Sequence, residues 1–86
     1  MNSVVLKSER LLQIYSELTE GRILRKKDLA WKFNVTERSI QRDIESLRCF
    51  FIERGLKQDI IYDRQMKGYR LENQSAILLN TSEILA

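Results

Sequence analysis

The side chains best suited to chemistry are four hydrogen-bonding residues that fall within five positions, Arg38, Ser39, Gln41 and Arg42. On a helix with about 100° of rotation per residue, the two arginines share the outer face, and Ser39 and Gln41 lie on its flanks. In the DNA major groove, arginine pairs with guanine, glutamine with adenine, and serine with a base or a phosphate. The segment therefore predicts a helix whose exposed face reads base edges.

The opposite side of the same segment is apolar, as a helix packed on a core requires. Thr36 can cap its start by accepting from a backbone N–H group, and the amides nearby can hold a phosphate. Gly55 can end it, so we expect a helix over about residues 37–54. The apolar residues of this helix are Ile40, Ile44, Leu47 and Phe51.

A shorter helix, over about residues 26–33, must precede this one to complete a helix-turn-helix. Ala30 is small enough for two helices to approach closely, and Asn34 accepts the positive φ of the turn. Lys26 and Lys27 open the shorter helix, where positive charge is unfavourable. We therefore assign these two lysines to contact with backbone phosphate.

A first helix and a short strand are expected before the helix-turn-helix. Ser8 can cap a helix that runs to about Glu20, and Gly21 suits the position that ends it. Ile23 and Leu24 then form an apolar pair that could make a two-residue strand.

After the helices, the apolar period changes to two, which predicts strands over residues 60–63 and 68–71 in a wing of about residues 59–71. Arg64 and Lys67 lie in its polar tip and suit phosphate or the minor groove. The predicted fold is mainly α with a small β-hairpin. It is a winged helix-turn-helix of three helices and a two- or three-stranded wing.

Four short motifs stand in this order: Asp-Leu-Ala at residues 28–30, Phe-Asn-Val-Thr at 33–36, Arg-Ser-Ile-Gln-Arg-Asp-Ile at 38–44, and Gly-Tyr-Arg-Leu at 68–71. Through them the chain resembles the N-terminal winged helix-turn-helix of WYL-domain and DeoR-type bacterial transcriptional regulators. The resemblance implies that the third helix enters the major groove of double-stranded DNA and that the hairpin is a wing along the backbone.

Two residues depart from the pattern of that family. Asn34 stands where such modules usually carry glycine, and Arg25 stands where a Ser or Thr cap is usual. A guanidinium has no acceptor for a backbone N–H group. We therefore expect the second helix to begin a residue or two late.

Composition limits the classes of function. Eighty-six residues make one domain with a small core, and residues 22–70 hold 13 of the 15 basic residues against seven acidic ones. Such an excess suits a polyanion such as nucleic acid. The sequence has no histidine, no cysteine pair and no phosphate-cradling glycine loop, so we expect no enzyme, no metal and no cofactor. No apolar run is long enough for a membrane, and the single Cys49 fits a reducing cytoplasm.

Two alternatives stay open from the sequence. A winged helix can also serve as a protein–protein interaction module, which would require exposed apolar residues on the outer face of residues 37–46. This chain has hydrogen-bonding residues there, so DNA is the first expectation. Arg38 and Arg42 could instead pair with acids along the helix, such as Glu45.

Several residues near the motif are assigned to structure rather than to DNA. Asp43 is acidic, so we expect it to orient an arginine or to accept from the backbone. Trp31 and Cys49 are expected to pack, and Tyr62 and Tyr69 to pack between the wing and the core.

Residues 1–72 thus form the predicted DNA-binding domain, and residues 73–86 differ in character. A polar stretch precedes the apolar residues 76–79, and Asn80 and Thr81 are a helix-start signal. We interpret this segment as a linker and the start of a missing C-terminal effector and oligomerisation region, through which alone an effector ligand would act. Its apolar residues also make a homodimer one expectation.

Overall fold

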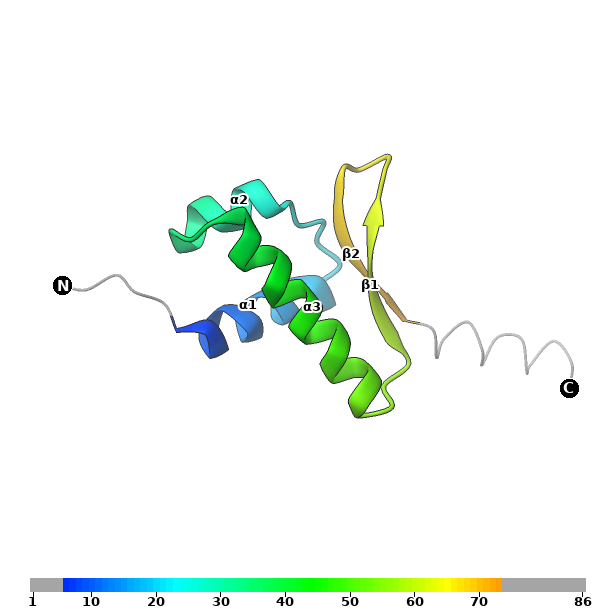
Figure 1. Ribbon diagram of the computed structural model, residues 1–86. Coiled ribbons are helices and arrows are strands. Elements are labelled where there is room, and N and C mark those ends of the chain that lie inside the picture. Colours follow the sequence, from blue (N-terminus) through cyan, green and yellow to red (C-terminus); the bar gives the residue numbers. More distant parts are fainter. Residues whose placement is uncertain (1–5, 74–86) are drawn as a thin grey trace, which may run out of the picture.

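The computed structural model of the protein describes residues 6–73, which form three helices followed by an antiparallel hairpin (Figure 1). Helices α2 and α3 make the helix-turn-helix, and the hairpin stands beside α3 as a wing. The predicted mainly helical fold with a small β-hairpin is confirmed. The elements are α1 (Lys7–Thr19), α2 (Lys26–Phe33), α3 (Glu37–Glu53), β1 (Gln58–Asp63) and β2 (Gly68–Asn73).

Helix α1 begins one residue earlier than its expected cap. Leu6 is the N-cap and its backbone N–H donates to Glu9 Oε1 at 3.3 Å, so Ser8 lies inside the first turn. A glutamate at the third helical position can satisfy the start of a helix in this way. The expected cap at Ser8 is therefore wrong. The other end is as expected, because Gly21 follows the helix with a φ of 86°.

Helix α2 begins at Lys26, so the expected late start is wrong. Arg25 is the N-cap residue and makes no side-chain capping bond. Its guanidinium instead donates to the Met66 carbonyl at 2.8 Å and so ties the start of α2 to the wing. Asn34 ends α2 with a φ of 56°, as the turn requires.

The core lies where the three helices meet the inner face of the wing. Ile40 of α3 and Ile14 of α1 are fully buried there, and Ile60 of β1 is buried in the same core from the side of the wing. Burial of a large aliphatic side chain stabilises a fold by about 1.5–3 kcal/mol, so these residues hold the three helices together. The buried apolar residues are Ile14, Leu18, Leu24, Leu29, Ala30, Phe33, Ile40, Ile44, Leu47, Phe51 and Ile60.

The wing is fastened to the segment before α2. Leu24 and Tyr69 exchange two backbone hydrogen bonds, at 2.8 and 2.6 Å, which makes an isolated β-bridge beside a two-stranded sheet, in place of the expected two-residue strand. A Cβ at Gly68 would lie only 2.5 Å from Ile23 Cγ2, so this close approach requires glycine. Each strand of the hairpin is two residues longer than predicted, at the end away from the tip. β1 begins at Gln58 and β2 ends at Asn73.

Two packing predictions are wrong, and a third holds only within the wing, where Tyr62 contacts Tyr69 but stays 53% exposed and apart from the core. Trp31 is 87% exposed, because the inner face of the short helix α2 is filled by Leu29, Ala30 and Phe33. Cys49 is exposed as well, on the side of α3 opposite Ile40.

The predicted linker begins one residue too early, because Asn73 ends β2 opposite Gln58. The rest of that linker, the helix start at residues 80–81 and the apolar residues expected to form a homodimer lie outside the described residues. Within residues 6–73, no helix is both long enough and apolar enough to cross a membrane.

Candidate nucleic-acid interface

The start of α3 is built by Thr36. Its Oγ1 accepts from the Ser39 backbone N–H at 3.0 Å and donates to Ser39 Oγ at 3.1 Å. The cap fixes the first turn of α3 and places Arg38 and Arg42, one turn apart, on its exposed side. Thr36 and Ser39 are thus both engaged with each other at the helix start.

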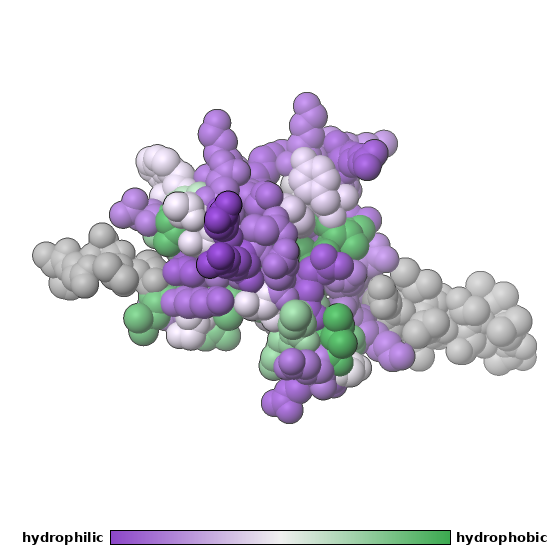
Figure 2. Space-filling model, viewed as in Figure 1, coloured by the Kyte–Doolittle hydropathy of each residue, from purple (hydrophilic) through white to green (hydrophobic). Residues whose placement is uncertain are grey.

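The side chains of Arg38 and Arg42 are exposed and make no hydrogen bond or ion pair with any other residue in the described part of the chain. Their suggested intrahelical partner, Glu45, accepts from Gln41 Nε2 at 3.1 Å instead. Two guanidinium groups with ten N–H donors between them therefore face solvent from one helix face. Figure 2 shows that hydrophilic residues cover most of this side of the molecule, over α3 and the wing.

The acidic residue that follows Arg42 points the other way. Asp43 is completely buried, and its two carboxylate oxygens accept from Arg10 Nε at 2.7 Å and Nη2 at 3.1 Å. These hydrogen bonds raise the pKa of the Arg10 guanidinium against the opposing effect of its burial. Asp43 thus orients an arginine, as expected, and joins α1 to α3 without weakening the positive outer face.

Gln41 lies on the flank of α3 that faces the wing. Its Oε1 accepts from Lys26 Nζ at 3.0 Å and lies 3.5 Å from the Tyr69 hydroxyl. Tyr69 in turn contacts Tyr62 edge to face, with ring centroids 5.2 Å apart. The side chains of α2, α3 and the wing therefore meet at one glutamine, which the sequence had assigned to base contact alone.

The wing tip is held by one carboxylate. Asp63 Oδ1 accepts from the backbone N–H groups of Met66 and Gln65, both at 2.9 Å, and Oδ2 pairs with Arg70 at 3.2 Å. Chiefly because of the Met66 bond, and further through Gln65 and Arg70, the pKa of Asp63 lies below its ordinary value. The tip loop is thus ordered around an anion, which leaves its cations pointing outward.

Arg64 and Lys67 are the outward cations of the tip, and both are exposed. Lys67 adopts a left-handed φ of 57° as the chain turns back into β2. Neither makes an ion pair among residues 6–73.

The two lysines that open α2 differ in their surroundings. Lys27 is exposed, with no hydrogen-bonding partner in the described segment, and Lys26 is half-buried against Gln41. Lys27 therefore suits a phosphate contact, whereas the ammonium group of Lys26 is already held by Gln41 of α3.

Sequence reasoning missed the residues that support this surface. Arg10 and Asp43 are 33 positions apart, and Arg25 and Met66 are 41 apart, so no local pattern links them. The Asp63 turn did carry a local signal, because aspartate commonly accepts from the backbone N–H two residues on.

Exposed apolar residues gather at the other end of α3. Phe50 and Leu12 line a groove between α1 and α3, next to the buried Phe51. Across residues 6–73, no group of three or more His, Cys, Asp or Glu side chains is arranged to hold a metal ion.

No protein-family model, curated protein or solved structure matches the chain. Inference of its function therefore depends on the geometry of the residues described above.

Proposed function

We propose that this protein binds double-stranded DNA in a sequence-specific manner, as the DNA-binding domain of a bacterial transcriptional regulator of the WYL or DeoR type. In this proposal the N-terminal half of α3 enters the major groove, and the tip between β1 and β2 lies along the sugar–phosphate backbone. The observation that carries it is the pair of exposed, unpartnered arginines, Arg38 and Arg42, on the outer face of the second helix of a helix-turn-helix.

Three features of the surrounding surface support DNA as the partner. The wing tip adds Arg64 and Lys67 beside α3, and Lys27 adds an exposed cation at the start of α2. Asp43, the acid that directly follows Arg42, is neutralised internally by Arg10. The surface is thus suited to phosphates around a base-reading centre.

Protein contact is the alternative use of a winged helix. It would favour apolar residues on the outer face of α3 near its start, and that face carries Arg38 and Arg42 instead. The exposed large apolar residues of α3 itself, Phe50 and Ile52, lie near its C-terminal end. Since bacterial DNA lies in the cytoplasm, the proposal places the protein there.

The direct test is selection of bound duplexes from a random pool, followed by titration of the best duplex with salt. We expect one sequence to be enriched and bound about 10³-fold or more tightly than a scrambled duplex. We also expect log K to fall linearly with log salt, because phosphate contacts release counterions. A pool that stays random after repeated selection would refute the proposal.

A further inference from the structure

The inference concerns the amide of Gln41, which is engaged on both sides. Lys26 Nζ donates to Oε1 at 3.0 Å, and Nε2 donates to Glu45 Oε2 at 3.1 Å. The Tyr69 hydroxyl lies 3.5 Å from the same Oε1, close enough for a weak third contact. Gln41 is therefore held between α2, its own helix and the wing.

The chemistry of the partners fixes which way this amide points. An ammonium group can only donate, so the atom beside Lys26 must be the carbonyl oxygen. A carboxylate can only accept, so the atom beside Glu45 must be the nitrogen. Rotating the amide by half a turn would put two donors against each other and two acceptors against each other.

The same contacts decide what Gln41 still has to offer a base. Its carbonyl oxygen accepts strongly from Lys26 Nζ at 3.0 Å, and the Tyr69 hydroxyl lies 3.5 Å from the same oxygen. Its nitrogen has two N–H groups, and Glu45 takes one of them. One donor and no strong acceptor remain on Gln41, and Lys26 keeps two further N–H donors beside it.

Pairing with adenine needs a glutamine that donates to N7 and accepts from the N6 amino group at once. On Gln41 the acceptor is already engaged by the ammonium group of Lys26. Guanine, in contrast, presents two acceptors in the major groove, N7 and O6. Two adjacent donors on different side chains match that edge, and an adenine amino group would oppose one of them.

We propose that Lys26 and Gln41 act together as a donor pair that selects guanine over adenine at one position of the DNA site. This inference rests on the proposed function and deepens it. It assigns guanine to Gln41, although a glutamine by itself usually pairs with adenine. Lys26 has two roles in it. Its ammonium withdraws the Gln41 carbonyl from base reading and supplies a donor of its own.

The experiment compares Lys26→Met with Lys27→Met, two neighbouring variants that each remove one positive charge. Binding sites are selected for the wild type and each variant, and affinities are then measured for duplexes that carry G or A at each position. We expect the wild type to prefer guanine about tenfold or more at the position in question. In Lys26→Met the freed carbonyl should let Gln41 pair with adenine, so that this preference falls about tenfold. Lys27→Met should weaken binding to all duplexes and leave the preference unchanged.

Gln41→Met provides a second variant with a different expected signature. It removes the amide and leaves Lys26, so the guanine preference should fall without a gain for adenine. Melting temperatures check that all variants fold.

The outcomes separate this inference from the proposed function. Suppose that the wild type selects a specific site but prefers adenine at the base position that responds to Lys26→Met. This result would contradict the proposed donor pair and leave the proposal of sequence-specific DNA binding intact. So would a base preference that neither Lys26→Met nor Gln41→Met changes. A wild type that selects no site would overturn the proposed function, and this inference with it.

Discussion

At the scale of single residues, the charged side chains fall into two groups with different duties. Arg10, Arg48 and Arg70 pair with carboxylates and hold elements together. Arg38 and Arg42 have no such partner among the described residues. Because a solvent-facing guanidinium contributes little to stability, substitution of the second group should affect binding and spare the fold.

Arg42→Ala gives a sharp form of this expectation. We expect it to reduce discrimination between the selected duplex and a scrambled one by about 1–3 kcal/mol, the usual worth of an arginine that contacts a base. The melting temperature should stay close to that of the wild type. Arg54→Ala, at the C-cap of the same helix and therefore at the end far from Arg42, is the control that removes an equal charge and should keep full discrimination. Equal affinity of Arg42→Ala and wild type for both duplexes would contradict the assignment.

Asp43→Ala should have the opposite profile. It would leave the Arg10 guanidinium, whose side chain is only 12% exposed, without the carboxylate that binds it through two hydrogen bonds. Removing one partner of a buried ion pair costs about 3–5 kcal/mol, so we expect the free energy of unfolding in urea to fall by about that amount.

The double variant Arg10→Met, Asp43→Leu tests the cause of that loss. It removes both charges and fills the space with apolar side chains, and should recover most of the lost stability. If the double variant is as unstable as Asp43→Ala, the loss would come from packing rather than from the broken ion pair with Arg10.

At the scale of elements, the helix-turn-helix could be predicted from sequence almost to the residue, because local chemistry sets its ends. Three local features set these ends: the Thr36 cap, the left-handed backbone of Asn34 and the apolar spacing along α3. Each depends only on residues a few positions apart. The wing could be predicted only in outline. Its longer strands and its fastening through Leu24 and Arg25 depend on contacts between distant segments, which no local pattern encodes.

The candidate site shows the same division. Exposed cations on α3 and at the wing tip followed from residue type and helical spacing. The engagement of Gln41 by Lys26 did not, since it joins α2 to α3 across 15 positions. Periodicity places a residue on a face of a helix, and only the packed structure tells which of its atoms are already used.

The wing tip offers a test by pH, because Asp63 holds it as an anion. Its pKa is lowered in the folded protein, chiefly by the Met66 hydrogen bond. A carboxylate whose pKa is lowered by folding stabilises the folded state at every pH above its ordinary pKa of 3.8. This contribution is lost as the pH falls through the lower pKa of the folded state. Asp63→Asn should therefore be less stable than wild type at pH 6, and the difference should shrink toward pH 3.

Urea unfolding midpoints of the two proteins at both pH values measure this effect. The comparison matters because other carboxylates also titrate in this range and shift both proteins alike. A gap that stays constant from pH 6 to pH 3 would show that the charge of Asp63 does not order the tip.

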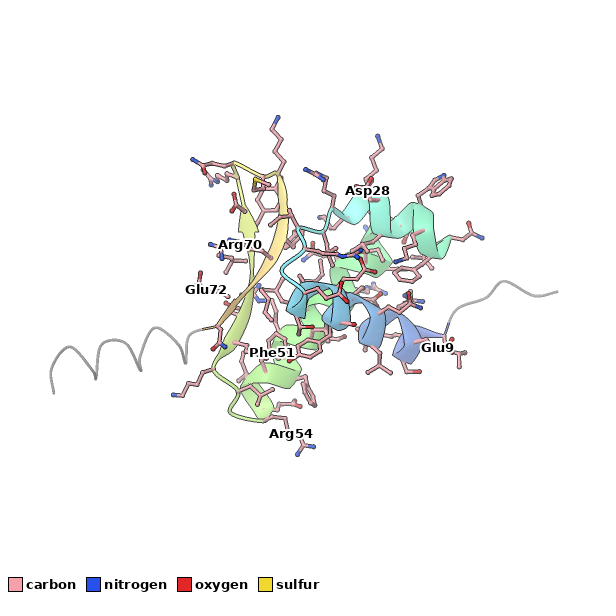
Figure 3. All side chains as sticks on the ribbon, turned by 180° about the vertical axis from the view of Figure 1, so that it is seen from behind. Glu9, Asp28, Phe51, Arg54, Arg70 and Glu72 are labelled. Atoms are coloured by element: carbon pink, nitrogen blue, oxygen red, sulfur yellow. The ribbon has the colours of Figure 1, made fainter. Side chains whose placement is uncertain are left out.

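At the scale of the whole molecule, the cations proposed to contact DNA and the apolar groove beside Phe50 lie at different ends. The wing tip and the start of α2 stand at one end, and the loop after α3 lies at the other (Figure 1). Seen from behind in Figure 3, Asp28 near the start of α2 and Arg54 after α3 mark these two ends. The proposed DNA would therefore meet the end with the tip, and the groove beside Phe50 would stay clear of it.

This polarity allows an electrostatic prediction with a matched control. Arg64→Gln with Lys67→Gln lowers the net charge of +3 by two at the wing tip, and Arg54→Gln with Lys57→Gln lowers it by the same amount at the opposite end. Each phosphate contact contributes about 0.9 to the slope of log K against log salt. If the tip lies on the backbone, its variant should weaken binding to every duplex and flatten the slope by about 1.8. The control pair changes the overall charge equally but makes no contact, so its slope should match that of the wild type. Equal flattening in both variants would mean that net charge, rather than a docked wing, sets the salt dependence.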